Sequence, residues 1–167
     1  MARITTAGIL SAAVLSGGIW AHRHATASAP PPLPTNSSEA FDYLRSVRFI
    51  AVDVFVDSGT IPLAAYQFEF SAPGGGASIV DIEGGESAAF TSPPYYDPEA
   101  LMQGRIIVGA FNTGDELPSG KTRVARMHLR VEGEPVAEFS VQLTVAGNVN
   151  GDQIDASASV ARAVSES

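Results

Sequence analysis

Four acids in two predicted loops are the first side chains of this sequence that could take part in catalysis. Asp97 and Glu99 lie in one loop, and Asp115 and Glu116 lie in the other. A pair of carboxyl groups about 5 to 9.5 Å apart can hydrolyse a glycosidic bond. Nothing in the spacing predicts such a separation, and loop acids are usually solvated. We therefore expect a protein without catalytic activity, and a small carboxylate-dependent hydrolase is the alternative.

The other chemical candidates lack complete motifs. His128 is the only histidine outside the N-terminal segment, and no nucleophile or ligand stands at a matching spacing. The chain has no cysteine, which excludes a thiolate metal site and a cysteine nucleophile. The run from Asn148 to Asp152 matches the first half of a calcium loop, but Gln153 replaces the required glycine. Asn150-Gly151 favours a hairpin turn with positive φ at both residues. We predict no metal and no cofactor.

The segment Ser92–Pro98 is the least ordinary loop. Its prolines stiffen the backbone, and Tyr95 and Tyr96 offer flat amphipathic rings beside Asp97. Such a loop could contact a protein or a sugar at low entropic cost. The alternative is that one tyrosine caps the edge of the fold while the other is merely exposed to water.

A basic stripe runs along one predicted strand of an otherwise acidic chain. It could receive an acidic partner, or it could pair across strands with Glu69 or Glu138. The stripe comprises Lys121, Arg123, Arg126 and Arg130. The candidate binding residues are therefore Tyr95, Tyr96, Asp97, Arg123, Arg126 and Arg130.

Alternating apolar residues predict the strands that must position these groups. In Leu63–Phe70 the aromatic residues share one face, and in Ile106–Phe111 both faces are apolar, as in a strand buried on both sides. The pattern of Arg123–Val131 slips at Ala125-Arg126. The other expected strands are Val47–Val56, Ala77–Ile82, Ala137–Val145 and Ile154–Val160. The predicted core includes Phe68, Phe70, Ile107 and Leu129.

Composition supports a single all-β domain that does not bind nucleic acid. The 167 residues are 45% hydrophobic, which is enough for one core, and 16 glycines and 11 prolines suit short strands joined by tight turns. The formal charge of -8 repels phosphate backbones.

The N-terminal segment has the features of an export signal. Arg3 precedes an apolar run that extends to Ala21, and cleavage after Ala27 fits the small-residue rule. An uncleaved membrane anchor is the alternative. We expect a signal or anchor over residues 1–27, a Pro/Ser-rich linker over 28–38 and the domain over 39–167, which begins with a short helix over Glu39–Arg45.

The order of five segments carries a resemblance to a known family. They are LAAYQFEF, IVDIEGG, GRIIVGAFNTG, KTRVARMHLRVEG and AEFSVQLTV, and the resemblance covers about Phe49 to Val145. Their order resembles the cohesin-like β-sandwich domains of exported bacterial proteins. The resemblance implies a single jelly-roll or immunoglobulin-like sandwich of about 8 to 9 strands that binds proteins or glycans. Ser71-Ala-Pro73 replaces the usual Tyr-Asp-Pro turn, so a dockerin-binding surface does not carry over.

These observations give one expected function. We expect a secreted or envelope-attached interaction module, and its partner would be another protein or a glycan at the cell surface. A structural spacer domain is the non-binding alternative. Contact with a membrane is expected only if the N-terminal segment is uncleaved.

Overall fold

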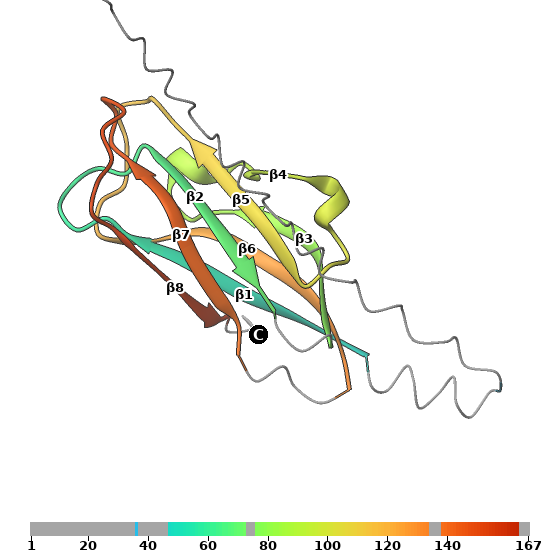
Figure 1. Cartoon of the computed structure of the whole chain (residues 1–167). Coiled ribbons are helices and arrows are strands. Elements are labelled where there is room, and N and C mark those ends of the chain that lie inside the picture. The colour runs from blue at the N-terminus through green and yellow to red at the C-terminus, as the bar shows by residue number, and fades with distance from the viewer. Residues whose placement is uncertain (1–35, 37–46, 73–75, 134–137, 164–167) are drawn as a thin grey trace, which may run out of the picture.

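The computed structural model describes residues 36, 47–72, 76–133 and 138–163. These residues form an all-β sandwich of two four-stranded antiparallel sheets, as the sequence predicts (Figure 1). The predicted signal, the short helix over Glu39–Arg45 and the linker, apart from Asn36, lie outside the described residues. Within the described part, no helix is long and apolar enough to cross a membrane.

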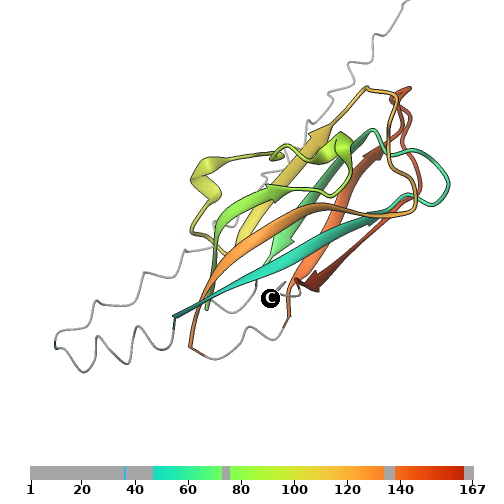
Figure 2. The same ribbon diagram turned by 180° about the vertical axis from the view of Figure 1, so that it is seen from behind.

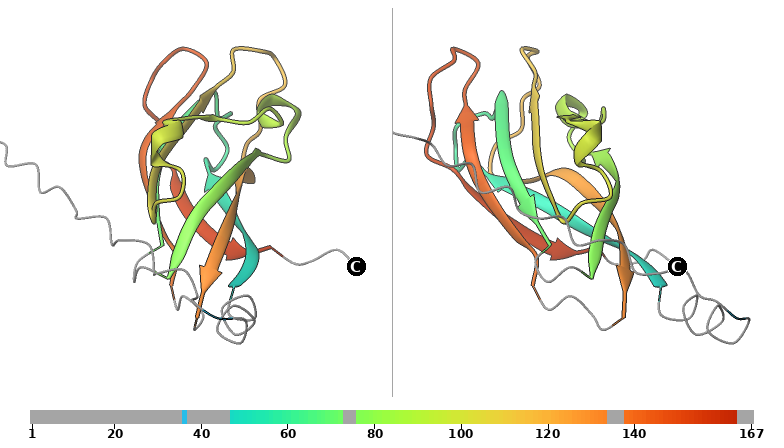
Figure 3. Two further views of the ribbon diagram at one scale, coloured as in Figure 1. Left: turned by 90° about the vertical axis from the view of Figure 1, so that its right-hand side faces the viewer. Right: turned by 45° about the vertical axis from the view of Figure 1, so that its right-hand side comes forward.

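Sheet A has the strand order β3-β6-β1-β8, and sheet B has the order β4-β5-β2-β7 (Figures 1 and 2). Sheet A comprises β1 (Val47–Asp57), β3 (Ala77–Gly84), β6 (Lys121–Glu132) and β8 (Ser157–Arg162). Sheet B comprises β2 (Ala65–Ser71), β4 (Tyr95–Tyr96), β5 (Arg105–Phe111) and β7 (Ser140–Gly147). Two short 3₁₀ helices, η1 (Ala88–Phe90) and η2 (Pro98–Ala100), flank β4. The segments that follow β5 and β7 project at the same end of the sandwich (Figure 3).

The core lies between the sheets and is built by the period-two alternation of their strands. Phe68 and Phe70 of β2 and Leu129 of β6 are fully buried, which confirms those predictions. The inward residues of β1 are valines, whose branched side chains pack well on a pleated surface. They are Val52, Val54 and Val56.

The prediction that Ile107 is buried was wrong, because only one face of β5 meets the other sheet. Ile106 and Val108 point inward and are at most 2% exposed, whereas Ile107 is 51% exposed. Successive side chains of a strand point to opposite faces, so apolar residues on both faces do not require burial on both. Val145 of β7 is also exposed, by 45%, because a bulge at Thr144 shifts the register of this strand.

A bulge in β6 matches the slip expected in its pattern. Ala125 pairs with Val54 and Arg123 with Phe55, so Val124 is the extra residue, and both Val124 and Ala125 are buried. The hydroxyl of Tyr66 on β2 donates a hydrogen bond of 2.9 Å to the carbonyl oxygen of Val124. This buried bond ties sheet B to sheet A at the bulge.

Candidate binding surfaces

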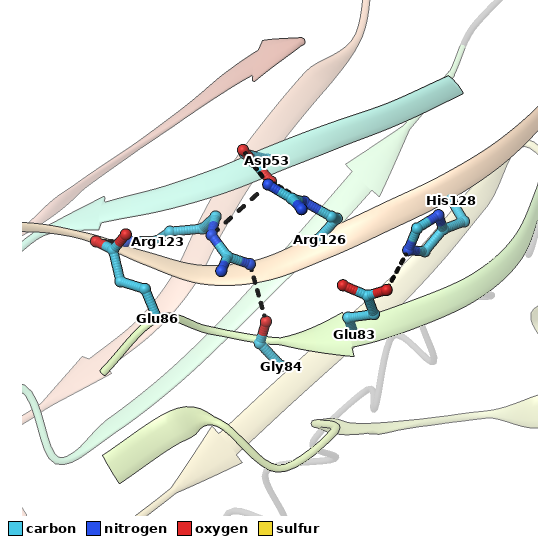
Figure 4. Close-up of polar contacts among 7 residues, drawn as sticks. All are labelled: Asp53, Glu83, Gly84, Glu86, Arg123, Arg126 and His128. Carbon is cyan, nitrogen blue, oxygen red and sulfur yellow. Dashed lines mark hydrogen bonds and ion pairs between the residues drawn. The ribbon is translucent and has the colours of Figure 1, made fainter. Parts of the chain in front are cut away.

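The arginines of the predicted basic stripe lie on the outer face of sheet A and contact groups of their own chain (Figure 4). Arg126 holds Asp53 through two hydrogen bonds of 2.7 and 3.1 Å. Asp53 is only 9% exposed, and Nε of Arg123 lies 3.9 Å from its Oδ1. Arg123 also donates to the carbonyl oxygen of Gly84 at 3.1 Å. The two arginines therefore stabilise a largely buried carboxylate.

The neighbouring polar groups of β6 also have partners within the chain. Nε2 of His128 lies 2.9 Å from Oε1 of Glu83, in a polar contact that is not aligned as a hydrogen bond, and Arg130 pairs with Glu132. Glu69 had been predicted as a cross-strand partner of the stripe. It lies on sheet B and pairs with Arg105 there, so the stripe does pair across strands, as Arg126 does with Asp53, but Glu69 was the wrong partner. Strand order decided the outcome, because β1 and β3, and not β2, flank β6.

Two of the predicted binding residues, Tyr96 and Arg123, line one open depression of about 450 Å³. It lies between the end of β3 and the segment that leads into β4. Asp81, Glu83 and Thr91 complete much of its polar wall. Small-molecule sites are usually concave and mostly apolar, so this shallow polar surface is a poor pocket for such a ligand.

The acids considered for catalysis take ordinary loop roles. Asp97 caps η2 and accepts a hydrogen bond of 2.9 Å from the backbone N–H of Glu99. Asp115 and Glu116 are exposed, and none of these four acids lines the depression. Among the described residues, no group of three or more His, Cys, Asp or Glu side chains could hold a metal ion.

The Asn148 turn differs in detail from the predicted hairpin. Gly151 has a φ of 84°, but Asn150 does not have a positive φ. The N–H of Gly151 donates to the carbonyl oxygen of Asn148, so residues 148–151 form a four-residue turn with glycine at its last position. Oδ1 of Asn148 accepts from the backbone N–H groups of Asn150 and Asp152 at 2.9 and 3.0 Å. The turn joins strands of different sheets, and a single bridge, between Gly147 and Gln153, continues β7.

The outer face of sheet B carries a cluster of exposed apolar side chains. We call it the apolar face and define it by Tyr95, Ile107, Phe111 and Val145. Their exposed fractions are 72%, 51%, 67% and 45%. The rings of Tyr95 and Phe111 stack with centroids 6.2 Å apart and planes 13° apart. Tyr96 points the other way and packs against the core, so one tyrosine caps the fold and the other is exposed.

Strand register places two members of the apolar face, Tyr95 and Val145, in one row across sheet B. Tyr95 lies opposite Gly109, Gly109 opposite Gln67, and Gln67 opposite Val145. A side chain at Gly109 would place its Cβ 3.2 Å from the carbonyl oxygen of Tyr66, which is a tight contact. With glycine at this position, no side chain projects from the middle of the row. The apolar face therefore has Tyr95 and Phe111 toward the β4 side of sheet B and Val145 toward the β7 side.

The polar groups on this face satisfy each other. Gln67 donates to the hydroxyl of Thr144 at 3.1 Å, and that hydroxyl donates to the carbonyl oxygen of Gln67 at 3.0 Å. Arg105 binds both carboxylate oxygens of Glu69, at 2.6 and 2.5 Å. These hydrogen bonds hold the pKa of Glu69 below its usual value and raise that of Arg105. The opposite charges cancel, so they add no net charge to the face.

In comparisons with known proteins, no family model, no curated protein and no solved structure matches this chain. The structure therefore shows a two-sheet sandwich, and the comparisons identify no family for it. Sequence reasoning selected Tyr95 but missed Ile107, Phe111 and Val145. The apolar residues on both faces of Ile106–Phe111 were the available signal, and they were interpreted as deep burial.

Proposed function

We propose that this chain is a non-catalytic interaction module of an exported or envelope-attached protein, and that it binds a protein partner through the apolar face. The observation that carries the proposal is the exposure of Tyr95, Ile107, Phe111 and Val145 on one sheet face. Exposed apolar side chains gathered on one face are typical of interaction sites, and aromatic anchors supply much of the energy of protein interfaces.

The aliphatic members favour a protein over a glycan. Ile107 and Val145 gain free energy by burial against other apolar side chains, whereas sugars stack on aromatic rings and accept hydrogen bonds. Gln67 and Thr144 bond to each other, and Arg105 bonds to Glu69, so these groups can be covered without losing partners. The cohesin-like order of segments and the export features of residues 1–27 support a module that works outside the cytoplasm. Binding of a glycan is the alternative outcome.

The chain offers a matched pair of exposed phenylalanines for the test. Phe111 is 67% exposed on sheet B, and Phe49 is 71% exposed on the outer face of sheet A. The purified chain and the variants Phe111→Ser and Phe49→Ser would be immobilised and exposed to solubilised envelope from the producing cells. We expect Phe111→Ser to lose the captured protein and Phe49→Ser to retain it.

The other outcomes would contradict the proposal. Equal capture by both variants would show that the apolar face does not take part in the interaction. Captured material that resists protease and is sensitive to glycosidase would identify a glycan ligand. If the wild-type chain captures nothing above an inert surface, the spacer-domain alternative is favoured.

A further inference from the structure

β8 forms an edge of sheet A, and the hydrogen-bond pattern shows which of its backbone groups face outward. The N–H of Ala163 donates to the carbonyl oxygen of Ala51 at 2.9 Å, so these opposed residues form a hydrogen-bonded pair. Antiparallel pairs alternate between bonded and non-bonded positions. Ala161 and Ser159 therefore bond to β1, while the N–H and C=O groups of Ala158 and Val160 point away from it.

The other edges are protected by features that β8 lacks. The backbone of Ile79 on β3 bonds to Gln103 and Met102 at 3.0 and 2.7 Å. β4 has only two residues, and β7 carries the bulge at Thr144 and bonds to Ile154. β8 has six residues, SASVAR, without proline, bulge or any charge before its last position. Among the described residues no strand or loop bonds to the outer edge of β8, and a long edge of this kind is ready to pair with another strand.

We propose that β8 pairs in antiparallel orientation with β8 of a second copy of this chain, which would join two A sheets into one. This inference is independent of the proposed function, because it uses a different surface. Asp152 and Asp155 precede β8, and Arg162 ends it. Antiparallel pairing brings Arg162 of each copy toward the acidic residues that precede β8 in the other copy. Because of the two-fold symmetry, this contact between opposite charges occurs twice.

The side chains along the strand are compatible with close approach. Between Ser157 and Ala161 only Val160 exceeds the size of serine. A six-residue edge buries far less than the roughly 1,200 Å² of a standard stable interface, so the dimer is weak and forms at high protein concentration.

Two alanines of β8 give a matched test. Proline at position 158 removes an N–H that faces the open edge, whereas proline at position 161 removes one that bonds to β1. Sedimentation velocity of the purified chain over a range of concentrations should show a reversible monomer–dimer equilibrium. We expect Ala158→Pro to weaken dimerisation at least about tenfold while the melting temperature stays close to wild type. Ala161→Pro should instead lower the melting temperature clearly.

A cysteine variant supplies a second readout that does not depend on proline tolerance. The chain has no cysteine, so Ser159→Cys introduces a single thiol. We take the register that places the two-fold axis at residue 159, so that Ala158 of one copy bonds to Val160 of the other. Residue 159 then lies opposite its own copy at a non-hydrogen-bonded position, where Cα atoms are about 4.5 Å apart, within disulfide reach. Mild oxidation should give a covalent dimer, and the control Ser140→Cys on β7 should not.

Three results would overturn the proposal. The first is a wild-type chain that stays monomeric at all concentrations, together with no cross-link through Ser159→Cys. The second is a dimer that Ala158→Pro leaves intact. The third is a dimer abolished by Phe111→Ser but not by Ala158→Pro, which would place the contact on the apolar face. Should Ala158→Pro fail to fold, the comparison of the two cysteine variants decides.

Discussion

At the scale of single residues, Tyr66 joins the two sheets through one buried polar contact. Its hydroxyl bonds to the carbonyl oxygen of Val124, the extra residue of the β6 bulge. Because a bulge leaves a residue outside the ladder, that carbonyl needs a partner from elsewhere. Burial of the phenol also raises its pKa above the ordinary value, since the charged form would lose its hydration.

The first prediction is that Tyr66→Phe lowers the free energy of unfolding by about 1 to 3 kcal/mol, because a buried acceptor loses its donor. Urea unfolding would measure it, with the exposed Tyr95→Phe as a control that should change little.

The native phenol of Tyr66 holds its proton at a pH where the unfolded chain releases it. Stability therefore falls as pH rises above about 10, and the difference between wild type and Tyr66→Phe should shrink there. A constant difference up to pH 11 would contradict this explanation.

The second prediction compares two bidentate arginine–carboxylate pairs that differ in burial. Side-chain exposure is 12% for Asp53 and 31% for its partner Arg126, against 24% for Glu69 and 66% for its partner Arg105. Asp53→Asn leaves two arginines facing a neutral group in a partly buried site, so we expect a loss of about 1 to 3 kcal/mol. Glu69→Gln on the exposed pair should cost less than about 1 kcal/mol. Denaturant unfolding measures both, and equal losses would mean that burial does not decide the cost.

At the scale of elements, β5 shows how one strand divides between core and interaction surface. The third prediction is that Ile106→Ala destabilises the fold by about 2 to 5 kcal/mol, because it leaves a cavity between the sheets. Ile107→Ala, one residue away on the exposed face, should change stability by less than about 1 kcal/mol. Thermal and urea unfolding would test the pair. A larger cost at Ile107 would indicate the opposite register, since a one-residue shift exchanges the two faces.

The turn after β7 supports a fourth prediction. We expect millimolar calcium, followed by chelator, to leave the melting temperature unchanged. Oδ1 of Asn148 already accepts two backbone hydrogen bonds, and the bidentate acid of a complete calcium loop is missing from the sequence. A ligand at 100 times its dissociation constant would add about 2.7 kcal/mol. A calcium-dependent rise that disappears in Asp152→Ala would show that the turn does bind the ion.

At the scale of the whole molecule, the core of the described sandwich is built from residues 47–163. The fifth prediction follows: a chain that lacks residues 1–36 should remain soluble, give a β-dominated circular dichroism spectrum and unfold at the temperature of the full chain. The reason is that every buried core residue of the sandwich lies between Val52 and Ile154. An insoluble or helical product would mean that the N-terminal segment contributes to the fold.

The two proposed surfaces lie on different sheets and could operate together. The apolar face belongs to sheet B, and the open edge belongs to β8 of sheet A. A dimer formed through β8 would therefore leave both apolar faces uncovered, and two weak contacts to a partner would reinforce each other.

The amino-acid sequence by itself determined the all-β class, the seven longer strands and most of the inward faces. Alternation of side chains is a local property, so Phe68, Phe70 and Leu129 could be assigned to the core without knowledge of the fold. The slip in the pattern of β6 was also visible in the sequence, and the structure explains it by a bulge, because an extra residue shifts the alternation wherever it occurs.

Only the tertiary structure decided what lies beside each strand. Strand order paired Arg126 with Asp53 and Arg105 with Glu69, and no local pattern encodes which strands become neighbours. The same order left the outer face of β5 without a covering layer, so Ile107 and Phe111 became surface. Whether an apolar side chain is core or interface depends on what packs over it, and this contact joins residues far apart in the chain.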